Sequence, residues 1–201
     1  MSEEIITKEK AKELIEKSPM ETRGFNVKHD GEYILKEKGS EGLAKLEKAW
    51  EEIGYPIKYK EIKDMDFIPG GMRAVSLLAI KKAFQADDEE IRNVCYFHPR
   101  TSLIVRLFSR YIYSLPSVMK KAQNMWKTYW TEGELEFVEH NKEEKYIIMR
   151  IKDFNLHPLF CRCMEGYFAS IAKLVLKEKT RCKETKCSHQ GDEYHEFLIE
   201  W

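Results

Sequence analysis

Four residues near the end of the chain carry side chains that bind metal ions: Cys161, Glu184, Cys187 and His195. They offer thiolate, carboxylate and imidazole groups, the three kinds of protein ligand that zinc accepts in a tetrahedral site. The sequence contains no C-x-x-C pair here, and a free cysteine is often simply a small buried apolar residue. Spacing alone therefore favours buried core thiols over a metal site.

A helix and a hairpin would have to bring these side chains together. Pro158 predicts the start of a helix through about residue 177, with Cys161 close to its beginning. The segments 180–186 and 194–201 have the pattern of paired strands, with a turn at 188–191. Such a hairpin places the end of its first strand beside the start of its second, and the helix can pack back onto the same edge.

Two spacings limit which residues can share one ion. Glu184 and Cys187 are three residues apart, and side chains along a strand alternate between its two faces. Both can face one ion only if a bulge or turn lies between them. Cys163 lies about 200° around a helix from Cys161, so these two cannot point at the same metal.

The rest of the chain predicts helices followed by one more hairpin. Apolar residues recur at helical spacing within 7–17, 43–53, 72–85, 87–95, 101–115 and 117–130. Residues 24–28 have the pattern of a short extended piece, and 135–138 with 146–151 that of a hairpin. We expect an α/β fold of the α+β type in a single domain. Its helical N-terminal part would pack on an antiparallel sheet of two hairpins with a helix between them.

Composition excludes several classes of function. The 201 residues include 34 Lys and Arg against 34 Asp and Glu, so the net charge of zero argues against a nucleic-acid partner. No apolar run approaches the roughly 20 residues that span a membrane, and the acidic start Met1-Ser2-Glu3-Glu4 lacks the apolar core of a secretory signal. The five cysteines are an odd number without a regular framework, which predicts reduced thiols and a cytoplasmic location.

Three runs in the last part of the chain resemble a known family. They are CRCMEGYF at 161–168, ETKC at 184–187 and GDEYHEF at 191–197. Together they are similar to the C-terminal signature of the 4-vinyl reductase domain family, also called hydrocarbon-binding domains. That family includes sensor domains of phenol-type transcriptional regulators. Its fold is shared with haem nitric-oxide sensors and Golgi transport-particle subunits.

The resemblance implies a structural zinc held by Cys161, Glu184, Cys187 and His195. His195 stands where the family has its last cysteine. A histidine preserves the ligand but removes one negative charge, which would weaken zinc binding somewhat. Four protein ligands leave no open position for water, so the implied site is structural and not catalytic.

The resemblance also implies a cavity for a small apolar or aromatic molecule. Our candidate lining residues are aromatic or imidazole side chains of the middle of the chain, namely Phe97, His98, Phe108, Tyr111, Trp126, Trp130, Phe137 and Tyr167. Among them His98 or Trp126 could form a hydrogen bond with a ligand hydroxyl. An ordinary aromatic core is the alternative.

We expect one domain over 1–201, with 1–56 a helical dimerisation or extension region and 57–201 the core.

The resulting hypothesis is a stand-alone small-molecule sensor that forms a homodimer and passes its signal to a separate protein. One alternative is a dimeric structural adaptor without a ligand, like the transport-particle subunits. A further alternative is an enzyme related to tetrapyrrole vinyl reductases, or a haem-binding sensor. We find no nucleotide-binding glycine motif and assign no catalytic residue. No motif provides an axial haem ligand, for which His98 is the only loose candidate, so we expect no haem.

Overall fold

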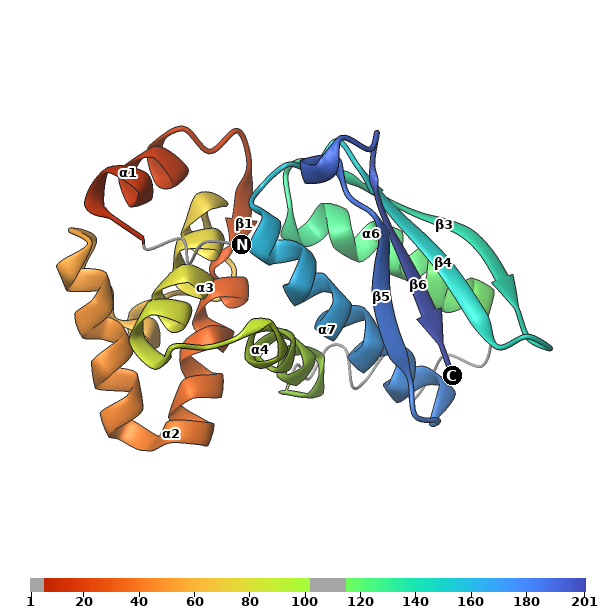
Figure 1. The fold of residues 1–201 in the computed structure, drawn as a ribbon, viewed down its shortest axis with the longest axis horizontal. Helices are drawn as coiled ribbons and strands as arrows, with labels where there is room; N and C mark the ends of the chain where they lie inside the picture. The colour runs from red at the N-terminus through yellow and green to blue at the C-terminus, as the bar shows by residue number, and fades with distance from the viewer. Residues whose placement is uncertain (1–5, 102–114) are drawn as a thin grey trace. The chain divides into compact units, whose positions relative to one another are not determined.

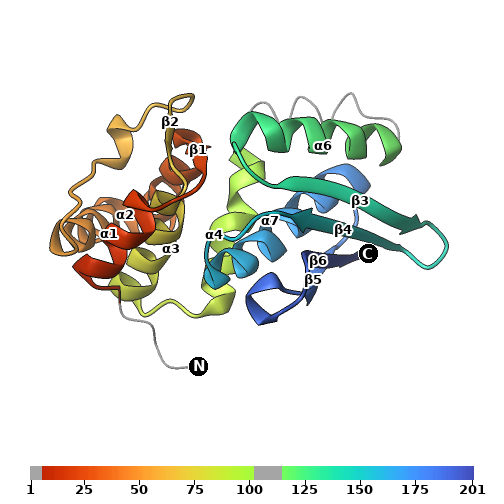
Figure 2. The same cartoon turned by 90° about the horizontal axis from the view of Figure 1, so that it is seen from above.

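A computed structural model describes residues 6–101 and 115–201, with side chains described over 6–97 and 121–201 (Figures 1 and 2). The chain divides into two compact units, Met1–Ile91 and Arg92–Trp201. The helices and antiparallel sheets confirm the predicted α+β class. The proposed division of the chain at residue 56 stays a prediction.

The first unit is mostly helical. Its elements in chain order are α1 (Lys8–Glu16), β1 (Glu21–Arg23), α2 (Gly24–Glu52), the 3-10 helix η1 (Tyr59–Glu61), β2 (Phe67–Pro69) and α3 (Gly71–Phe84). Strands β1 and β2 pair in antiparallel fashion, and α2 is interrupted at Gly39, whose φ is 68°.

One local expectation in this unit was wrong. Residues 24–28 are the first turns of α2, and the extended piece is β1 immediately before them. Val27 and Ile34 explain the difference, because both are completely buried and lie two helical turns apart on one face. That spacing reaches beyond the short segment that looked extended in the sequence.

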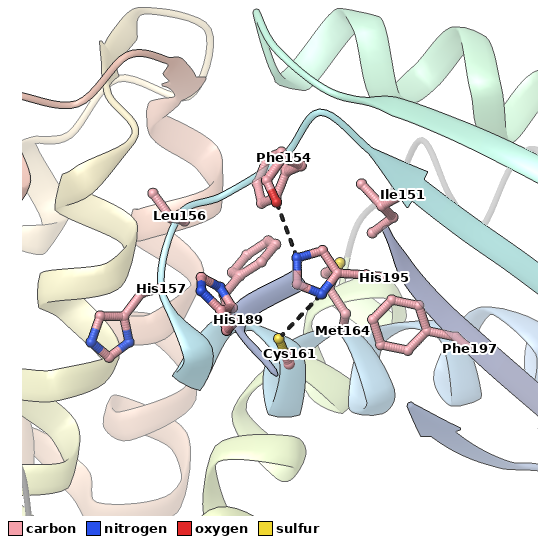
Figure 3. A pocket seen from close by; sticks show the side chains of 10 residues that line it. Ile151, Phe154, Leu156, His157, Cys161, Met164, His189, His195 and Phe197 are labelled. Carbon is pink, nitrogen blue, oxygen red and sulfur yellow. Dashed lines mark hydrogen bonds between the residues drawn. The ribbon is translucent and has the colours of Figure 1, made fainter. Parts of the chain in front are cut away.

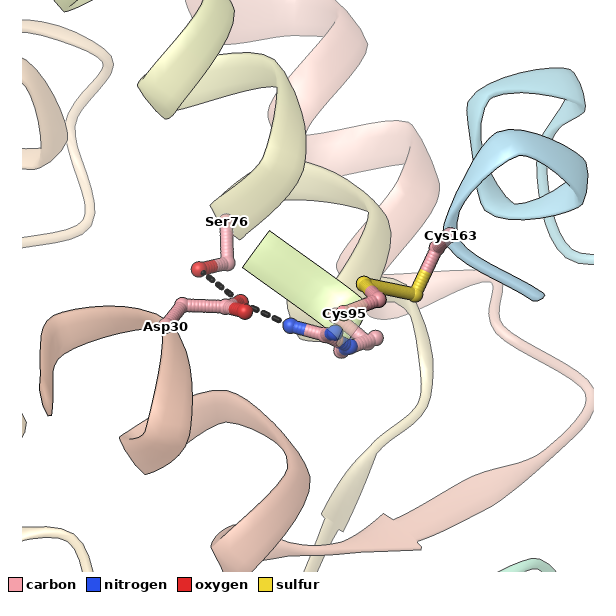
Figure 4. Close-up of a disulfide and its surroundings, with 5 residues drawn as sticks. Asp30, Ser76, Cys95 and Cys163 are labelled. Carbon is pink, nitrogen blue, oxygen red and sulfur yellow. Dashed lines mark hydrogen bonds and ion pairs between the residues drawn. A yellow bond between two sulfur atoms is a disulfide. The ribbon is translucent and has the colours of Figure 1, made fainter. Parts of the chain in front are cut away.

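A chain of buried polar groups connects α2, η1 and α3. The Trp50 indole N–H donates to the Tyr59 hydroxyl over 2.7 Å, and the Tyr59 and Ser76 hydroxyls lie 2.8 Å apart. Ser76 donates to Asp30 over 2.6 Å (Figure 4), and Asp30 also pairs with Arg73. All five side chains are buried, so this unit has a polar centre inside its apolar core.

The second unit contains a four-stranded antiparallel sheet and its helices. Helix α4 (Asp88–Thr101) crosses the division between the units. The elements that follow are α6 (Leu115–Tyr129), β3 (Glu134–Asn141), β4 (Tyr146–Lys152), α7 (Pro158–Leu176), β5 (Arg181–Lys186), the 3-10 helix η2 (Ser188–Gln190) and β6 (His195–Glu200). The strand order is β3-β4-β6-β5. The two predicted hairpins with a helix between them are therefore confirmed, while most of the predicted helix 101–115 falls outside the described residues.

Helix α7 covers one face of this sheet (Figure 1). Alternate residues of β4 on that face, Ile147, Met149 and Ile151, are buried. Phe168 of α7 meets Phe197 of β6 edge-on, with 5.2 Å between ring centroids. This packing gives the helix and the terminal hairpin a common apolar core.

The cysteines differ from the expectation of five free thiols. Cys95 on α4 and Cys163 on α7 form a disulfide (Figure 4), whereas Cys161, Cys182 and Cys187 are free. The two cysteines of this disulfide lie 68 residues apart in the sequence, so no local spacing indicated that they pair. The cytoplasmic location rested partly on reduced thiols and stays a prediction. Among the described residues, no helix has the length and apolar character needed to cross a membrane.

Candidate metal centre

The four residues predicted as metal ligands meet at one place in the second unit. One possible ligand atom from each of Cys161, Glu184, Cys187 and His195 lies within 4.8 Å of all the others. Cys161 comes from the first turn of α7 and Glu184 from β5, while Cys187 follows β5 directly and His195 begins β6. Three of the four are buried and Glu184 is nearly so.

The start of α7 is set by local signals. The Nδ1 atom of His157 accepts a hydrogen bond from the backbone N–H of Leu159 over 3.1 Å, which caps the helix. Pro158 follows at the first helical position, where its missing N–H costs nothing. Cys161 is thereby held in the first turn of the helix, as the sequence predicts.

The predicted interruption between Glu184 and Cys187 is present. The pairing of β5 with β6 shifts register between Glu184 and Lys186, so the alternation of side chains is broken there. The backbone N–H of Cys187 donates to the Asp192 carboxylate over 2.8 Å. Gly191 turns the chain with a φ of 100°, a conformation that favours glycine. These features direct Glu184 and Cys187 to the same place.

The distances between ligand atoms fit a tetrahedral ion. With Zn–S bonds of about 2.3 Å and Zn–N bonds of about 2.0 Å, a tetrahedron separates two sulfurs by about 3.8 Å and a sulfur and a nitrogen by about 3.5 Å. The Cys161 and Cys187 sulfurs lie 3.8 Å apart. Cys161 Sγ lies 3.7 Å from His195 Nδ1. His195 Nδ1 in turn lies 2.9 Å from Glu184 Oε1, a hydrogen-bond distance that is shorter than the roughly 3.3 Å between a nitrogen and an oxygen ligand of one zinc ion. The four side chains therefore lie close enough together to coordinate one ion with only small movements.

The hydrogen bonds of His195 determine which ring nitrogen can bind a metal. Its Nε2 lies 3.0 Å from the carbonyl oxygen of Phe154 (Figure 3). The Ser188 hydroxyl lies 2.7 Å from the same nitrogen. A carbonyl only accepts, so a hydrogen on Nε2 satisfies it, and a neutral ring with that hydrogen has its lone pair on Nδ1. Nδ1 faces Glu184 and Cys161. Such a hydrogen bond on the far nitrogen is the usual support of a metal-bound histidine. Without a metal, a protonated ring would instead donate from Nδ1 to the Glu184 carboxylate.

The electrostatics of the cluster favour a cation. Burial and the nearby Glu184 carboxylate raise the pKa of Cys161, and the same two causes raise the pKa of Cys187. Burial acts to raise the pKa of Glu184, but hydrogen bonds with His195 and Cys161 outweigh it and lower that pKa. Three groups able to carry negative charge thus crowd together, and a bound cation would relieve their repulsion.

A small cavity borders the cluster. Its volume is about 10 Å³, and its lining includes Cys161 and His195 together with His189 and apolar side chains (Figure 3). Such a volume is close to that of one water molecule, whereas an apolar cavity that binds benzene is about 150 Å³. This cavity is therefore too small for an aromatic ligand, and none of the predicted pocket residues whose side chains the structure describes lines it.

The predicted pocket residues lie in several places. Trp126 and Trp130 belong to an aromatic cluster with Phe154 and Phe160, in which ring centroids lie between 5.0 and 6.0 Å apart. The Trp126 indole N–H donates a hydrogen bond to the backbone carbonyl of Glu132 over 3.1 Å.

The remaining members of that predicted set are half-buried or undescribed. Phe97 on α4, Phe137 on β3 and Tyr167 on α7 are half-buried. Phe108 and Tyr111 lie outside the described residues, and so does the side chain of His98. The ligand pocket therefore stays a prediction.

Sequence reasoning missed one buried residue next to the metal ligands. The Glu165 side chain on α7 is 2% exposed and accepts a hydrogen bond from the backbone N–H of Glu184 over 2.9 Å. Its place one helical turn after Cys161, within the run that carries the family resemblance, was the available signal.

Comparisons with known proteins support the family and the fold. Residues 157–201 match the model of the 4-vinyl reductase (V-4-R) domain. A search of curated protein sequences found no significant match.

Solved structures similar to the chain include H-NOX domains. An H-NOX protein from S. oneidensis in the Fe(II)NO ligation state is 12% identical, with a TM-score of 0.66 over 89% of this chain and 98% of that one. An oxygen-binding H-NOX domain related to soluble guanylate cyclases is 11% identical, with a TM-score of 0.63 over 89% and 94%. A third, from work on heme distortion in the H-NOX family, is 14% identical, with a TM-score of 0.60 over 89% and 94%.

These structural relatives bear on two of our expectations. Their fold agrees with the relation to haem nitric-oxide sensors that the sequence suggested. Their association with heme does not support our expectation that haem is absent. The chain therefore has the α+β fold of H-NOX domains, and its residues 157–201 match the 4-vinyl reductase domain model.

Proposed function

We propose that the chain is a small-molecule binding or sensing domain whose second unit holds a structural zinc ion. The observation that carries the zinc is the gathering of four ligand atoms from Cys161, Glu184, Cys187 and His195 within 4.8 Å of one another. Thiols, carboxylates and imidazoles are all ligand types that zinc accepts. When bound, zinc supplies a cation that neutralises the buried thiolates and carboxylate.

The ligands come from elements that lie apart in the sequence. Cys161 belongs to α7, and the other three belong to the β5–β6 hairpin and its turn. One ion would tie the helix to the hairpin at the end where the chain turns back. Because an unfolded chain does not hold such a site together, the free energy of zinc binding would stabilise the folded unit.

A metal-free alternative exists for the same four residues. His195 and Glu184 could form an ion pair, with Cys161 and Cys187 as plain core thiols. The two readings differ in metal content. Elemental analysis of protein purified without chelators should find about one zinc per chain by the tetrahedral-site argument. A chain that is folded, free of zinc and unable to take it up would contradict the proposed site.

The sensing part of the proposal concerns a small apolar or aromatic molecule. It is supported by the 4-vinyl reductase domain match over 157–201 and by the H-NOX fold, whose solved examples include an oxygen complex. Native mass spectrometry of the same sample tests this part, because a co-purified small molecule adds a defined mass. The same spectra test the predicted homodimer, and cell fractionation tests the cytoplasmic location. A monomer or dimer that carries no small molecule, and binds none from a panel of phenols and hydrocarbons, would favour the adaptor alternative.

Haem is the second candidate ligand, and the fold favours it. The solved relatives include work on heme distortion and an Fe(II)NO complex. Titration of the purified chain with hemin separates the two candidates, since specific haem binding gives a sharp Soret band that saturates at one haem per chain. Absence of that band would leave the apolar-ligand proposal in place.

A further inference from the structure

Glu165 lies buried between the metal cluster and α4. Its side chain is only 2% exposed, and a buried carboxylate is costly unless charged or polar partners surround it. One carboxylate oxygen accepts from Arg92 Nε over 2.6 Å. The other accepts from Arg162 Nη1 over 2.7 Å and from the backbone N–H of Glu184 over 2.9 Å. Glu165 thus has partners on α4, α7 and β5.

Two of these contacts lead to the metal ligand Glu184. The hydrogen bond to its backbone N–H fixes the peptide that carries the ligand side chain. Arg162, held by Glu165, also reaches Glu184 Oε2 at 3.7 Å. The other carboxylate oxygen, Oε1, is the one that lies beside His195 Nδ1. Arg162 therefore occupies the oxygen that points away from His195, which leaves Oε1 facing the cluster.

The third contact anchors Glu165 from the opposite side. Helix α4 passes very close to α7 at this point, because a Cβ atom on Gly166 would lie 2.0 Å from the carbonyl oxygen of Arg92. Only glycine permits that approach. The close passage brings Arg92 within reach of Glu165, and the Cys95–Cys163 disulfide joins the same two helices one turn along α4.

We propose that Glu165 is a positioning residue for the metal site, which sets Glu184 through its backbone N–H and through Arg162. This inference rests on the proposed zinc site. Groups that hydrogen-bond to metal ligands set their orientation, and losing one typically weakens metal affinity about 10- to 100-fold. Nothing in the contacts of Glu165 requires it to touch the ion itself.

The experiment compares Glu165→Gln with Glu178→Gln in the full chain. Glu178 follows the same helix but pairs with Lys145 at the exposed surface, so its variant controls for the loss of a charge. Zinc affinity is measured by competition with a chromophoric chelator, and ligand geometry by the absorption spectrum of the Co²⁺-loaded protein. We expect Glu165→Gln to weaken zinc affinity about 10-fold or more and to change the Co²⁺ spectrum, and Glu178→Gln to alter neither.

A second pair keeps the inference testable if Glu165→Gln does not fold. Arg162→Gln removes the half-exposed guanidinium between Glu165 and Glu184, and Arg181→Gln removes an exposed arginine of β5 that pairs with Glu200. We expect a changed Co²⁺ spectrum and weaker zinc binding only for Arg162→Gln.

The outcomes separate the two proposals. If the unaltered chain binds neither zinc nor Co²⁺, the proposed zinc site fails, and this inference fails with it. If the unaltered chain binds zinc while the Glu165 and Arg162 variants keep its affinity and Co²⁺ spectrum, only the inference is overturned. A lower melting temperature with unchanged metal properties would show that Glu165 has a purely structural part.

Discussion

His195 Nε2 lies 3.0 Å from the Phe154 carbonyl oxygen, and the ring thereby directs Nδ1 toward Cys161 and Glu184. A cysteine at this position, as in the family pattern, would bring one more negative charge to the ion. With histidine, two thiolates and one carboxylate would leave a zinc site with one net negative charge. The hydrogen bond to Phe154 compensates in part, because it raises the basicity of the ligating nitrogen.

The ligand role of Cys187 gives the first prediction. Cys187→Ala should purify with much less zinc than the unaltered chain. It should also melt roughly 10 °C lower, which corresponds to a loss of about 3 kcal/mol in a chain of this size. Calorimetry with elemental analysis measures both. Cys182→Ala is the control, because Cys182 is a free thiol of β5 outside the cluster. Equal zinc content and melting temperature in the two variants would contradict the site.

His29 gives a second prediction, which concerns pH. Burial, together with the positive charge of Arg73, lowers the pKa of His29 from 6.5 to about 4. Between these pH values His29 binds a proton in the unfolded chain but stays neutral in the folded chain. The free energy of unfolding therefore falls as the pH drops from 6.5 to 4. The shift corresponds to about 3 kcal/mol.

Urea unfolding at pH 7 and at pH 4.5 measures this effect. His29→Gln should lose less stability over that interval than the unaltered chain, because glutamine does not titrate. Parallel pH profiles for the two proteins would show that His29 does not contribute.

At the scale of elements, different kinds of contact stabilise the inside of each unit. In the second, α7 and the β5–β6 hairpin share an apolar core and the metal cluster. In the first, α2, η1 and α3 meet around a buried hydrogen-bonded chain that ends at Asp30 and Arg73. The buried pair allows α2 and α3 to pack in one arrangement, since any shift would leave a charge without its partner.

Removing one partner of that pair is the third prediction. Asp30→Ala leaves Arg73 buried without its carboxylate and should lower the unfolding free energy by about 3–5 kcal/mol. Asp64→Ala breaks the exposed pair with Lys28 and should cost less than about 1 kcal/mol. Denaturant unfolding of both variants measures the difference. Similar losses in the two would mean that the buried pair does not hold the helices.

At the scale of the whole molecule, the candidate metal cluster belongs entirely to the second unit. All four ligands lie between residues 161 and 195, within Arg92–Trp201. The first unit has its own core and its own polar chain. Zinc should therefore act on the stability of one unit and leave the other unchanged.

Hydrogen exchange followed by mass spectrometry tests this fourth prediction. Removing zinc with a chelator should speed amide exchange in β5, β6 and the first turns of α7, because the ion ties these elements together. Amides of α2 and α3 serve as the internal control and should exchange at an unchanged rate. Uniform acceleration over both units, or none in β5 and β6, would contradict a zinc that stabilises the second unit alone.

Features that depend on the periodicity of neighbouring residues could be predicted from the sequence. Helical and strand periods predicted α1, α3, α6 and both hairpins, because each period depends on neighbouring residues, and Pro158 predicted the start of α7. The four candidate metal ligands were singled out because their types are few and because the terminal runs resemble a family signature. The need for a bulge between Glu184 and Cys187 followed from strand geometry alone, and the register shift confirmed it.

Other features were decided only by the tertiary structure. The Cys95–Cys163 disulfide and the Arg92–Glu165 pair join residues 68 and 73 positions apart, and no local period records such a contact. Asp30 and Arg73 appear in the sequence as ordinary charged residues, and only packing makes them a buried pair. Likewise only the structure places the N–H of Trp126, a predicted pocket residue, on a backbone carbonyl, and the pocket itself stays a prediction. The sequence determined which side chains have the chemistry, and the long-range packing of α4, α7 and the sheet decided which of them meet.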